Sequence, residues 1–406
     1  MHRRSALIAT AAMLASPLLG SRVRAQQSPP PVKLGVLEDM AGPTSYLNGQ
    51  GSVDATQLAV DDFGGKVIGR PIVVISADHQ QKPAVGAAIA RRWLDQDGVD
   101  VLLDVPNSDI ALAVDQVIAE KKKLAIFVGA VTDRISEQDC NPYAMQWGLD
   151  TYADAQTVRP LIKAGFNTFF FLTSDYVFGH TLETAARTAI ASAGGKVLGS
   201  VTIPLETTDY SSFLVQAQAS GAKVVALLIS GGSRLVTAFK QAREFGLADA
   251  DHKVTSLHIY TEDVHTLGLQ ATQGLEAVVP FYWDRDAQSR DFSERYKKRF
   301  GHLPSELHAG TYSAALNYLR AVQKAGTTDA DKVRAAMAEI KINDVYAVNA
   351  KLLPNGRLIH DLFLVQVKTP AESKYPWDYF KILETIPAEE AFRPISQSVC
   401  PMLKHT

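Results

Sequence analysis

The sequence predicts an α/β protein of two similar lobes, each a doubly wound parallel sheet covered by helices on both faces to give three layers. Two observations lead to this fold class. Apolar runs typical of buried strands alternate with amphipathic segments of helical period, which is the pattern of parallel sheets. The alternation also begins twice along the chain, so we expect two lobes built on one plan.

The first series of elements occupies the N-terminal third of the chain. Its strands are short apolar runs, and the segments between them have apolar residues at helical spacing. The expected strands are 32–37, 71–77, 99–105 and 124–128, and the expected helices are 51–63, 84–95 and a segment that ends near residue 121.

The second series repeats this order and is followed by a less regular C-terminal part. Its first helix is expected to end at Gly194 and Gly195. The expected strands are 167–172, 197–203, 224–229 and, later, 362–367, and the expected helices are 179–193, 211–220, 234–245, 290–300 and 309–325.

The strand–helix pattern of the sequence changes near residues 146–150, 277–286 and 345–355, and these changes indicate three passages of the chain between the lobes. Three passages make a hinge of three strands rather than a flexible tether, so we expect two lobes that close on a ligand. The expected division is 32–148 with 284–345 for the N-terminal lobe, 149–283 with 346–370 for the C-terminal lobe, and 371–406 for an extension tied back to the N-terminal lobe.

The first 25 residues have the pattern of a secretory signal. Arg3 and Arg4 belong to a basic start, residues 6–19 are apolar but short for a membrane span, and small residues precede the expected cleavage near Ala25. An uncleaved anchor helix is the alternative, and the arginine pair also admits twin-arginine export. No other segment approaches the ~20 apolar residues of a membrane-spanning helix.

Composition and cysteine usage restrict the partners. The 406 residues are 46% hydrophobic and carry a net charge of −2, so the sequence has no electrostatic footprint for nucleic acid. Cys140 and Cys400 would meet an oxidising compartment after export, and we expect a disulfide between them; two free buried thiols are the alternative. No His or Cys lies at ligand spacing around either cysteine, which argues against a metal site.

Four segments follow one another in a recognisable order: GVLEDMAGPTSYLNGQG (35–51), GAVTDRIS (129–136), SDYVFG (174–179) and TTDYSSFLVQAQASGAKVVALL (207–228). With them the chain resembles the periplasmic solute-binding proteins of ABC importers, in the branch typified by leucine/isoleucine/valine-binding protein. The resemblance covers nearly all of the chain after the signal. It implies a periplasmic, monomeric protein of two lobes that holds a small carboxylate ligand between them, performs no catalysis, and has an inner-membrane ABC permease as its partner.

Two turns of the first lobe are candidate ligand contacts. In doubly wound sheets ligands bind beyond the carboxyl ends of strands, where helix N-termini present unpaired N–H groups. Asn107 and Ser108 lie at one such turn, and Ala130, Val131 and Thr132 lie at the next. The resemblance implies that Ser108 and the second turn hold an α-carboxylate. An ordinary N-cap is the alternative for Ser108, and the two roles are compatible.

The resemblance implies further contacts from other loops. Tyr46, Tyr152 and the turn from Asp175 to Phe178 are expected to face the cleft. Glu262 stands where amino-acid binders place a carboxylate for the ligand ammonium, which would give a charged hydrogen bond. A surface turn tyrosine is the alternative for Tyr46, and a solvated loop carboxylate is the alternative for Glu262.

Departures from the amino-acid pattern favour another ligand. Phe178 replaces a tyrosine, and the small residues around Gly231 stand where another is expected, which predicts a roomier pocket. The segments FYWDRD, with Phe281 and Tyr282, and PWDYFKIL (376–383) resemble the subgroup that binds aromatic acids of the benzoate, phenylpropanoid or aromatic keto-acid type. Such a ring would fill the pocket by stacking and burial. The alternatives are a branched-chain amino acid as the ligand and hinge packing for the aromatic residues.

Other functional classes find less support in the sequence. There is no G-x-S-x-G elbow, no G-x-G-x-x-G after the first strand, and no third ligand at zinc spacing near His252, His258 and His265. We therefore expect neither a catalytic site nor a cofactor nor a metal. A ligand sensor stays open as an alternative to a transport protein, because both functions use the same closure of the lobes.

Overall fold

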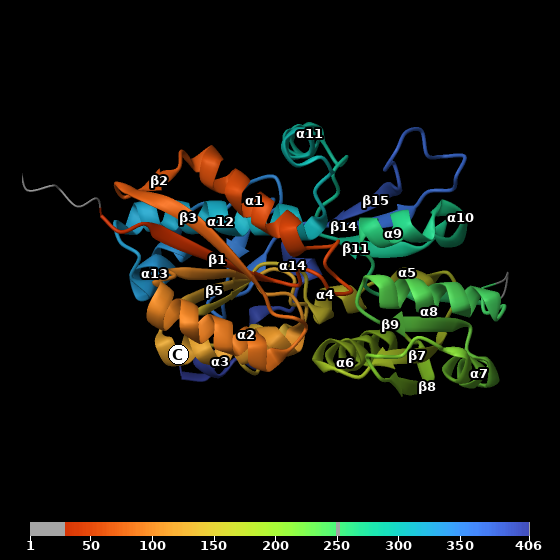
Figure 1. The fold of residues 1–406 in the computed structure, drawn as a ribbon. Helices are drawn as coiled ribbons and strands as arrows, with labels where there is room; N and C mark the ends of the chain where they lie inside the picture. Colours follow the sequence, from red (N-terminus) through yellow and green to blue (C-terminus); the bar gives the residue numbers. More distant parts are fainter. Residues whose placement is uncertain (1–28, 249–251, 406) are drawn as a thin grey trace, which may run out of the picture.

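The computed structural model describes residues 29–248 and 252–405, in which two α/β lobes lie side by side (Figure 1). The strands of the first lobe are β1 (Val32–Glu38), β2 (Lys66–Val67), β3 (Arg70–Asp78), β4 (Val101–Asp104), β5 (Leu124–Phe127) and β6 (Ala144–Gln146). They form one sheet of order β2-β3-β1-β4-β5-β6, in which only the β2–β3 pair is antiparallel. The predicted signal and its cleavage site near Ala25 fall outside the described residues.

The helices of the first lobe come from two separate parts of the chain. They are α1 (Gly49–Phe63), α2 (Pro83–Arg92) with the π-helical η1 (Trp93–Asp97), α3 (Ser108–Lys121), the short η2 (Asp133–Ile135), and later α11 (Ala287–Phe300), α12 (Glu306–Ala325) and α13 (Ala330–Glu339). Helix α12 is buried along most of its length and packs against α1 and β4. Its small residues, most of them alanine, permit this close approach, so the late helices complete the first lobe.

The second lobe repeats the plan with a smaller sheet. Its strands are β7 (Thr168–Ser174), β8 (Lys196–Ile203), β9 (Val224–Leu228) and β10 (Lys253–Ser256), and its helices are α4 (Thr151–Ala155), α5 (Val158–Lys163), α6 (Val177–Ser192), α7 (Ser211–Ala219), α8 (Ser233–Glu244), α9 (Thr261–Leu267) and α10 (Leu269–Thr272). The four strands are parallel, in the order β10-β9-β7-β8. The predicted α/β class with parallel sheets and covering helices is confirmed.

An antiparallel sheet continues the second lobe beyond the expected boundary at residue 370. It contains β11 (Glu276–Val279), β14 (Leu362–Val367) and β15 (Phe380–Ile386), in the order β11-β14-β15, and a small pair, β12 (Lys351–Leu352) with β13 (Leu358–Ile359), precedes it. Strand β15 was not expected. It is an edge strand with mostly exposed polar residues on one face, so it lacks the apolar run that marks a buried strand.

The C-terminal tail returns from the second lobe to the first. After α14 (Ala388–Ala391) and η3 (Ile395–Gln397), a guanidinium nitrogen of Arg393 lies 2.8 Å from a carboxylate oxygen of Asp133. The tail then forms the Cys140–Cys400 disulfide and ends in η4 (Pro401–His405), beside α3 in Figure 1. The predicted disulfide is present, and the tail adds a further passage between the lobes.

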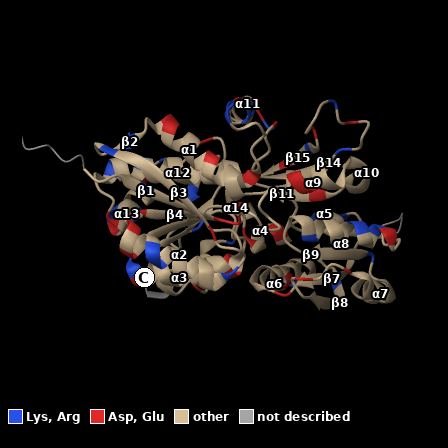
Figure 2. Ribbon diagram, in the orientation of Figure 1, with Lys and Arg blue, Asp and Glu red and all other residues tan. Residues whose placement is uncertain are grey.

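Charged residues of both signs are interspersed over the helices of the two lobes (Figure 2), in keeping with the net charge of −2. Within residues 29–248 and 252–405, no helix combines the length and the apolar character needed to cross a membrane.

Candidate functional site

The turn that joins β4 to α3 has an unusual backbone. Asp104, Val105 and Asn107 all have positive φ angles, of 69°, 55° and 77°. This conformation is strained for a β-branched residue such as Val105, and such strain is found where the surroundings hold a functional turn in place. The Asp104 carboxylate supplies part of that support, since it accepts hydrogen bonds from Gly129 N at 2.7 Å and Ser52 Oγ at 2.7 Å.

Asn107, rather than Ser108, caps helix α3. The Asn107 Oδ1 accepts a hydrogen bond from Asp109 N at 3.0 Å, and Ser108 is the first helical residue. The cap role that we allowed for Ser108 is therefore filled by its neighbour. The Ser108 Oγ instead accepts a hydrogen bond from Thr132 N at 3.3 Å, so the two predicted turns are joined directly.

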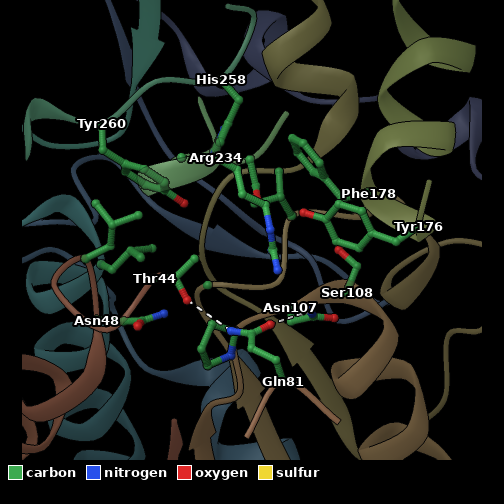
Figure 3. Close-up of a pocket in the computed structure, with 17 residues that line it drawn as sticks. Thr44, Asn48, Gln81, Asn107, Ser108, Tyr176, Phe178, Arg234, His258 and Tyr260 are labelled. Carbon is green, nitrogen blue, oxygen red and sulfur yellow. Dashed lines mark hydrogen bonds between the residues drawn. The ribbon is translucent and has the colours of Figure 1, made fainter. Parts of the chain in front are cut away.

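A cavity lies between the two lobes next to these turns. Its walls differ in chemistry. The first lobe contributes mainly neutral polar side chains, and the second lobe contributes mainly rings. The polar first-lobe residues are Thr44, Asn48, Gln81, Asn107 and Ser108, and the principal second-lobe residues are Tyr176, Phe178, Arg234, His258 and Tyr260 (Figure 3).

The rings of the second lobe form a continuous wall. The ring centroids of Tyr176 and Phe178 are 5.7 Å apart, those of Phe178 and His258 are 5.4 Å apart, and those of His258 and Tyr260 are 4.7 Å apart. These spacings are typical of favourable aromatic contacts. The wall can therefore offer both ring faces and ring edges to a flat ligand.

Arg234 brings a positive charge into the cavity and was missed by the sequence analysis. It is the second residue of α8, and its guanidinium points toward the polar side chains of the first lobe (Figure 3). The side chain is 23% exposed, and the nearest acidic oxygen, from Glu206, is 3.9 Å away on a side chain that is 95% exposed. No Asp or Glu is among the described residues that line the cavity. Arg234 therefore remains available to an anion.

His258 forms a buried pair with Asp154 behind the ring wall. Its Nδ1 lies 2.8 Å from Asp154 Oδ2, and the side chains are 3% and 1% exposed. Burial works to lower the pKa of His258, but the charge and hydrogen bond of Asp154 outweigh it, with further help from Asp263 and Glu306, so the pKa is raised. The Asp154 carboxylate therefore favours the protonated form of His258 more than water does.

Five of the predicted ligand contacts line this cavity: Asn107, Ser108, Val131, Phe178 and Gly231. Ala130 and Thr132 are fully buried and are not among the lining residues. At Gly231 an added Cβ would lie 2.4 Å from the ring of Tyr260. The room left by this glycine is thus taken by a tyrosine from another segment and does not enlarge the pocket.

Four other predicted contacts lie outside the cavity lining. Tyr46 is at the rim, where its hydroxyl donates to Asp263 Oδ1 at 3.0 Å and links the two lobes. Glu262 is not among the lining residues. Asp175 is exposed and bonds to the neighbouring His180. Tyr152 lies under the Arg393 guanidinium, 4.9 Å from ring centroid to Cζ, in a groove formed with the tail.

Phe281 and Tyr282 pack in the hinge and do not line the cavity. Phe281 is 1% exposed and meets the ring of Phe292 edge-on, with a centroid distance of 6.1 Å. The Tyr282 hydroxyl donates to Trp377 O at 2.9 Å and accepts from Tyr379 N at 3.0 Å. The structure thus places both rings in the alternative role that we gave them.

Comparison with known proteins identifies the relatives of the chain. The family model described as periplasmic binding protein matches residues 31–374. The crystal structure of a periplasmic binding protein from Burkholderia mallei is 45% identical, with a TM-score of 0.89 over 91% of this chain and 98% of that one. A branched chain amino acid ABC transporter periplasmic ligand-binding protein from Burkholderia xenovorans is 41% identical, with a TM-score of 0.82 over 91% and 99% of the two chains. Leu/Ile/Val-binding protein homolog 6 from Brucella melitensis is 25% identical over 68% of this chain and 71% of its own length.

Proposed function

The chain belongs to the periplasmic binding protein family, and from that premise we propose that it captures a small aromatic carboxylate between its lobes and delivers it to an inner-membrane ABC permease. We further propose that it works in the periplasm after its signal is removed. The observation that carries the ligand class is the chemistry of the cavity. The second lobe contributes one arginine and a wall of four rings, and the first lobe contributes neutral polar groups.

The carboxylate of the ligand is proposed to bind at the outer end of the cavity. Arg234 can donate two parallel charged hydrogen bonds there, and Ser108 and Asn107 lie opposite it at the N-terminus of α3. An α-amino acid would also bring an ammonium group. No acidic residue among those described lines this outer space, so an ammonium group bound there beside the carboxylate would lack a direct counter-ion, which is unfavourable. The cavity therefore favours a carboxylate that has no ammonium group.

The ring of the ligand is proposed to lie against the wall formed by Tyr176, Phe178, His258 and Tyr260. Rings packed at centroid distances of about 4.5–7 Å gain roughly 0.5–1.5 kcal/mol beyond simple burial. A branched aliphatic side chain would gain the burial but not this additional term. The wall therefore supports an aromatic ligand over leucine, isoleucine or valine.

A branched-chain amino acid is the second candidate. It is favoured by the likeness to the Burkholderia xenovorans protein, whose description names a branched chain amino acid transporter. In that case a carboxylate near the cavity, such as Glu262 or Glu306, would have to receive the ligand ammonium.

Ligand-induced thermal stabilisation separates the two candidates. The mature protein is heated with benzoate, benzoylformate or 4-coumarate, and in parallel with leucine, isoleucine or valine. At 100 times its Kd, a ligand that binds only the folded state stabilises the protein by about 2.7 kcal/mol. We expect such stabilisation from at least one aromatic acid, and chromatography after incubation should recover the acid unchanged. Stabilisation by the amino acids alone would establish the second candidate instead.

A further inference from the structure

We infer that the inner end of the cavity recognises a hydroxyl group on the ligand ring, and that His258 and Glu306 form hydrogen bonds with this hydroxyl. This inference rests on the proposed function and makes it more specific. The ligand class becomes a small aromatic carboxylate with a hydroxyl at the end remote from its carboxylate.

His258 lies where the cavity continues inward. A second, smaller space adjoins the first, and both are lined by Val131, His258, Tyr260 and Leu307. Arg234, Asn107 and Ser108 line only the outer space, whereas Glu306 lines only the inner one. A ring whose carboxylate is held by Arg234 therefore directs its far end toward His258 and Glu306.

Two buried polar atoms at this inner end have no hydrogen-bond partner among the described residues. His258 uses Nδ1 for Asp154, and its Nε2 is unpaired. Glu306 uses Oε1 to accept hydrogen bonds from Thr261 N at 3.3 Å and Thr261 Oγ1 at 2.8 Å, and its Oε2 is unpaired. Leaving a buried polar atom unpaired costs about 1–3 kcal/mol, so a ligand group that bonds to both atoms is favoured over one that bonds to neither.

The two atoms match a hydroxyl group better than the other common ring substituents. With Nδ1 facing Asp154, the Nε2 of His258 donates to a hydroxyl oxygen when the ring is protonated and accepts from the hydroxyl when the ring is neutral, so a hydroxyl group suits both forms. The same hydroxyl can donate to the Glu306 carboxylate. Burial raises the pKa of Glu306, and if that carboxyl is protonated the hydroxyl oxygen accepts from it instead. An aromatic amine is a poor acceptor for His258, and a plain C–H leaves both atoms unpaired.

Besides His258 and Glu306, the side chains with polar groups among the described lining residues of the inner space are Tyr260 and Tyr346. The remaining lining of the inner space is largely apolar, with Val128, Leu149, Ile259 and Val278 among its side chains. A site built to bond a hydroxyl rejects the analogue that lacks it far more strongly than an apolar pocket rejects a different size. The inference therefore predicts discrimination between ligands that differ only in this group.

Calorimetric titration of matched ligand pairs tests the inference. The pairs are benzoate with 4-hydroxybenzoate and cinnamate with 4-coumarate, each titrated into the full mature protein at neutral pH. We expect the hydroxylated member of at least one pair to bind about tenfold more tightly or better, since the plain analogue leaves a buried pair of polar atoms unsatisfied. The variants His258→Phe, which keeps a ring against Phe178 and Tyr260, and Glu306→Met should reduce that ratio to about threefold or less.

The matched control is His180→Phe, because His180 also pairs with an aspartate, Asp175 at 2.9 Å, but is exposed and outside the cavity. Its ratio should equal that of the wild type. Misfolding of a variant would weaken the binding of both ligands of a pair. Loss of the hydrogen bonds to the hydroxyl group changes the ratio of their two affinities. If aromatic acids bind but the wild-type ratio is near one, or if it survives both cavity substitutions, the inference is overturned and the proposed function stands. If no aromatic acid binds, both fail.

Discussion

Replacing Arg234 by methionine should remove most of the affinity for a carboxylate while leaving the fold intact. Truncating one partner of a buried charged pair costs about 2–5 kcal/mol, and the Arg234 side chain, at 23% exposure, belongs near the lower end of that range. A loss of about 2–3 kcal/mol corresponds to roughly a 30- to 160-fold increase in Kd. The existing contact with Glu206 contributes little, because that glutamate is almost fully solvated.

Isothermal titration with the aromatic acid that binds most tightly measures this loss. Arg234→Lys serves as the control, since lysine keeps the charge but loses the planar fork, and its loss should be smaller. Chemical unfolding of Arg234→Met should differ from the wild type by no more than about 0.5 kcal/mol, as for other solvent-accessible substitutions. An increase in Kd of less than about threefold, with the fold intact, would show that the carboxylate is held elsewhere.

Three further predictions concern the first lobe, the tail and the buried ion pair. Ser108→Ala should raise the ligand Kd by about tenfold, the worth of one hydrogen bond, and should also lower the unfolding free energy by about 1 kcal/mol because Thr132 N loses its acceptor; titration and urea unfolding measure the two losses, and an unchanged Kd would contradict the ligand contact. Reducing the Cys140–Cys400 bond should lower the unfolding free energy by about 2–5 kcal/mol, so an unchanged melting temperature in reductant would refute a stabilising role. The raised pKa of His258 should contribute stability that is complete below the free imidazole pKa of about 6.5 and lost as the pH rises through the folded value. Urea unfolding between about pH 5 and pH 9 should show this loss in the difference between wild type and His258→Phe, and a flat difference would exclude it.

The regular elements could be predicted because their signal lies within a few neighbouring residues. Strands β1, β9 and β14 are continuous apolar runs, and the structure places them within one residue of the predicted bounds. The rule that ligands bind beyond the carboxyl ends of parallel strands also brought Asn107, Ser108 and Val131 to the cavity. These predictions needed only local pattern and the geometry of one sheet.

Arg234 and His258 could not be found in that way, because their roles depend on how one lobe faces the other. Arg234 lies in the first turn of an amphipathic helix, where an arginine is ordinarily a solvated residue. His258 was tested as a metal ligand against its neighbours in sequence, whereas its partner, Asp154, lies at the other end of the second lobe's chain segment. Only the placement of α4 beside the strand end after β10 brings the two together.

The prediction that Phe281 and Tyr282 contact the ligand failed for another reason: a cluster of aromatic residues in the sequence has two structural explanations. Alternation along a strand predicts that Phe281 and Tyr282 point to opposite faces, but not what each face meets. The structure places one against α11 and the other against the hairpin before β15, while the cavity wall is built from Tyr176, Phe178 and Tyr260. A hinge and a ligand wall require the same residue types, so composition alone does not distinguish them.

The division of polar groups between the lobes links specificity to closure for the proposed ligand. Arg234 and His258 belong to the second lobe, and Ser108 and Glu306 belong to the first, so both ends of the ligand are paired only when the lobes are together. A ligand stabilises the closed arrangement only by the contacts that it makes there and not in the open one. A carboxylate without the far hydroxyl would close the lobes over two unpaired buried atoms, and their cost would oppose closure itself. Weak binding and incomplete closure should therefore occur together for the wrong ligand, because both arise from the same unpaired atoms.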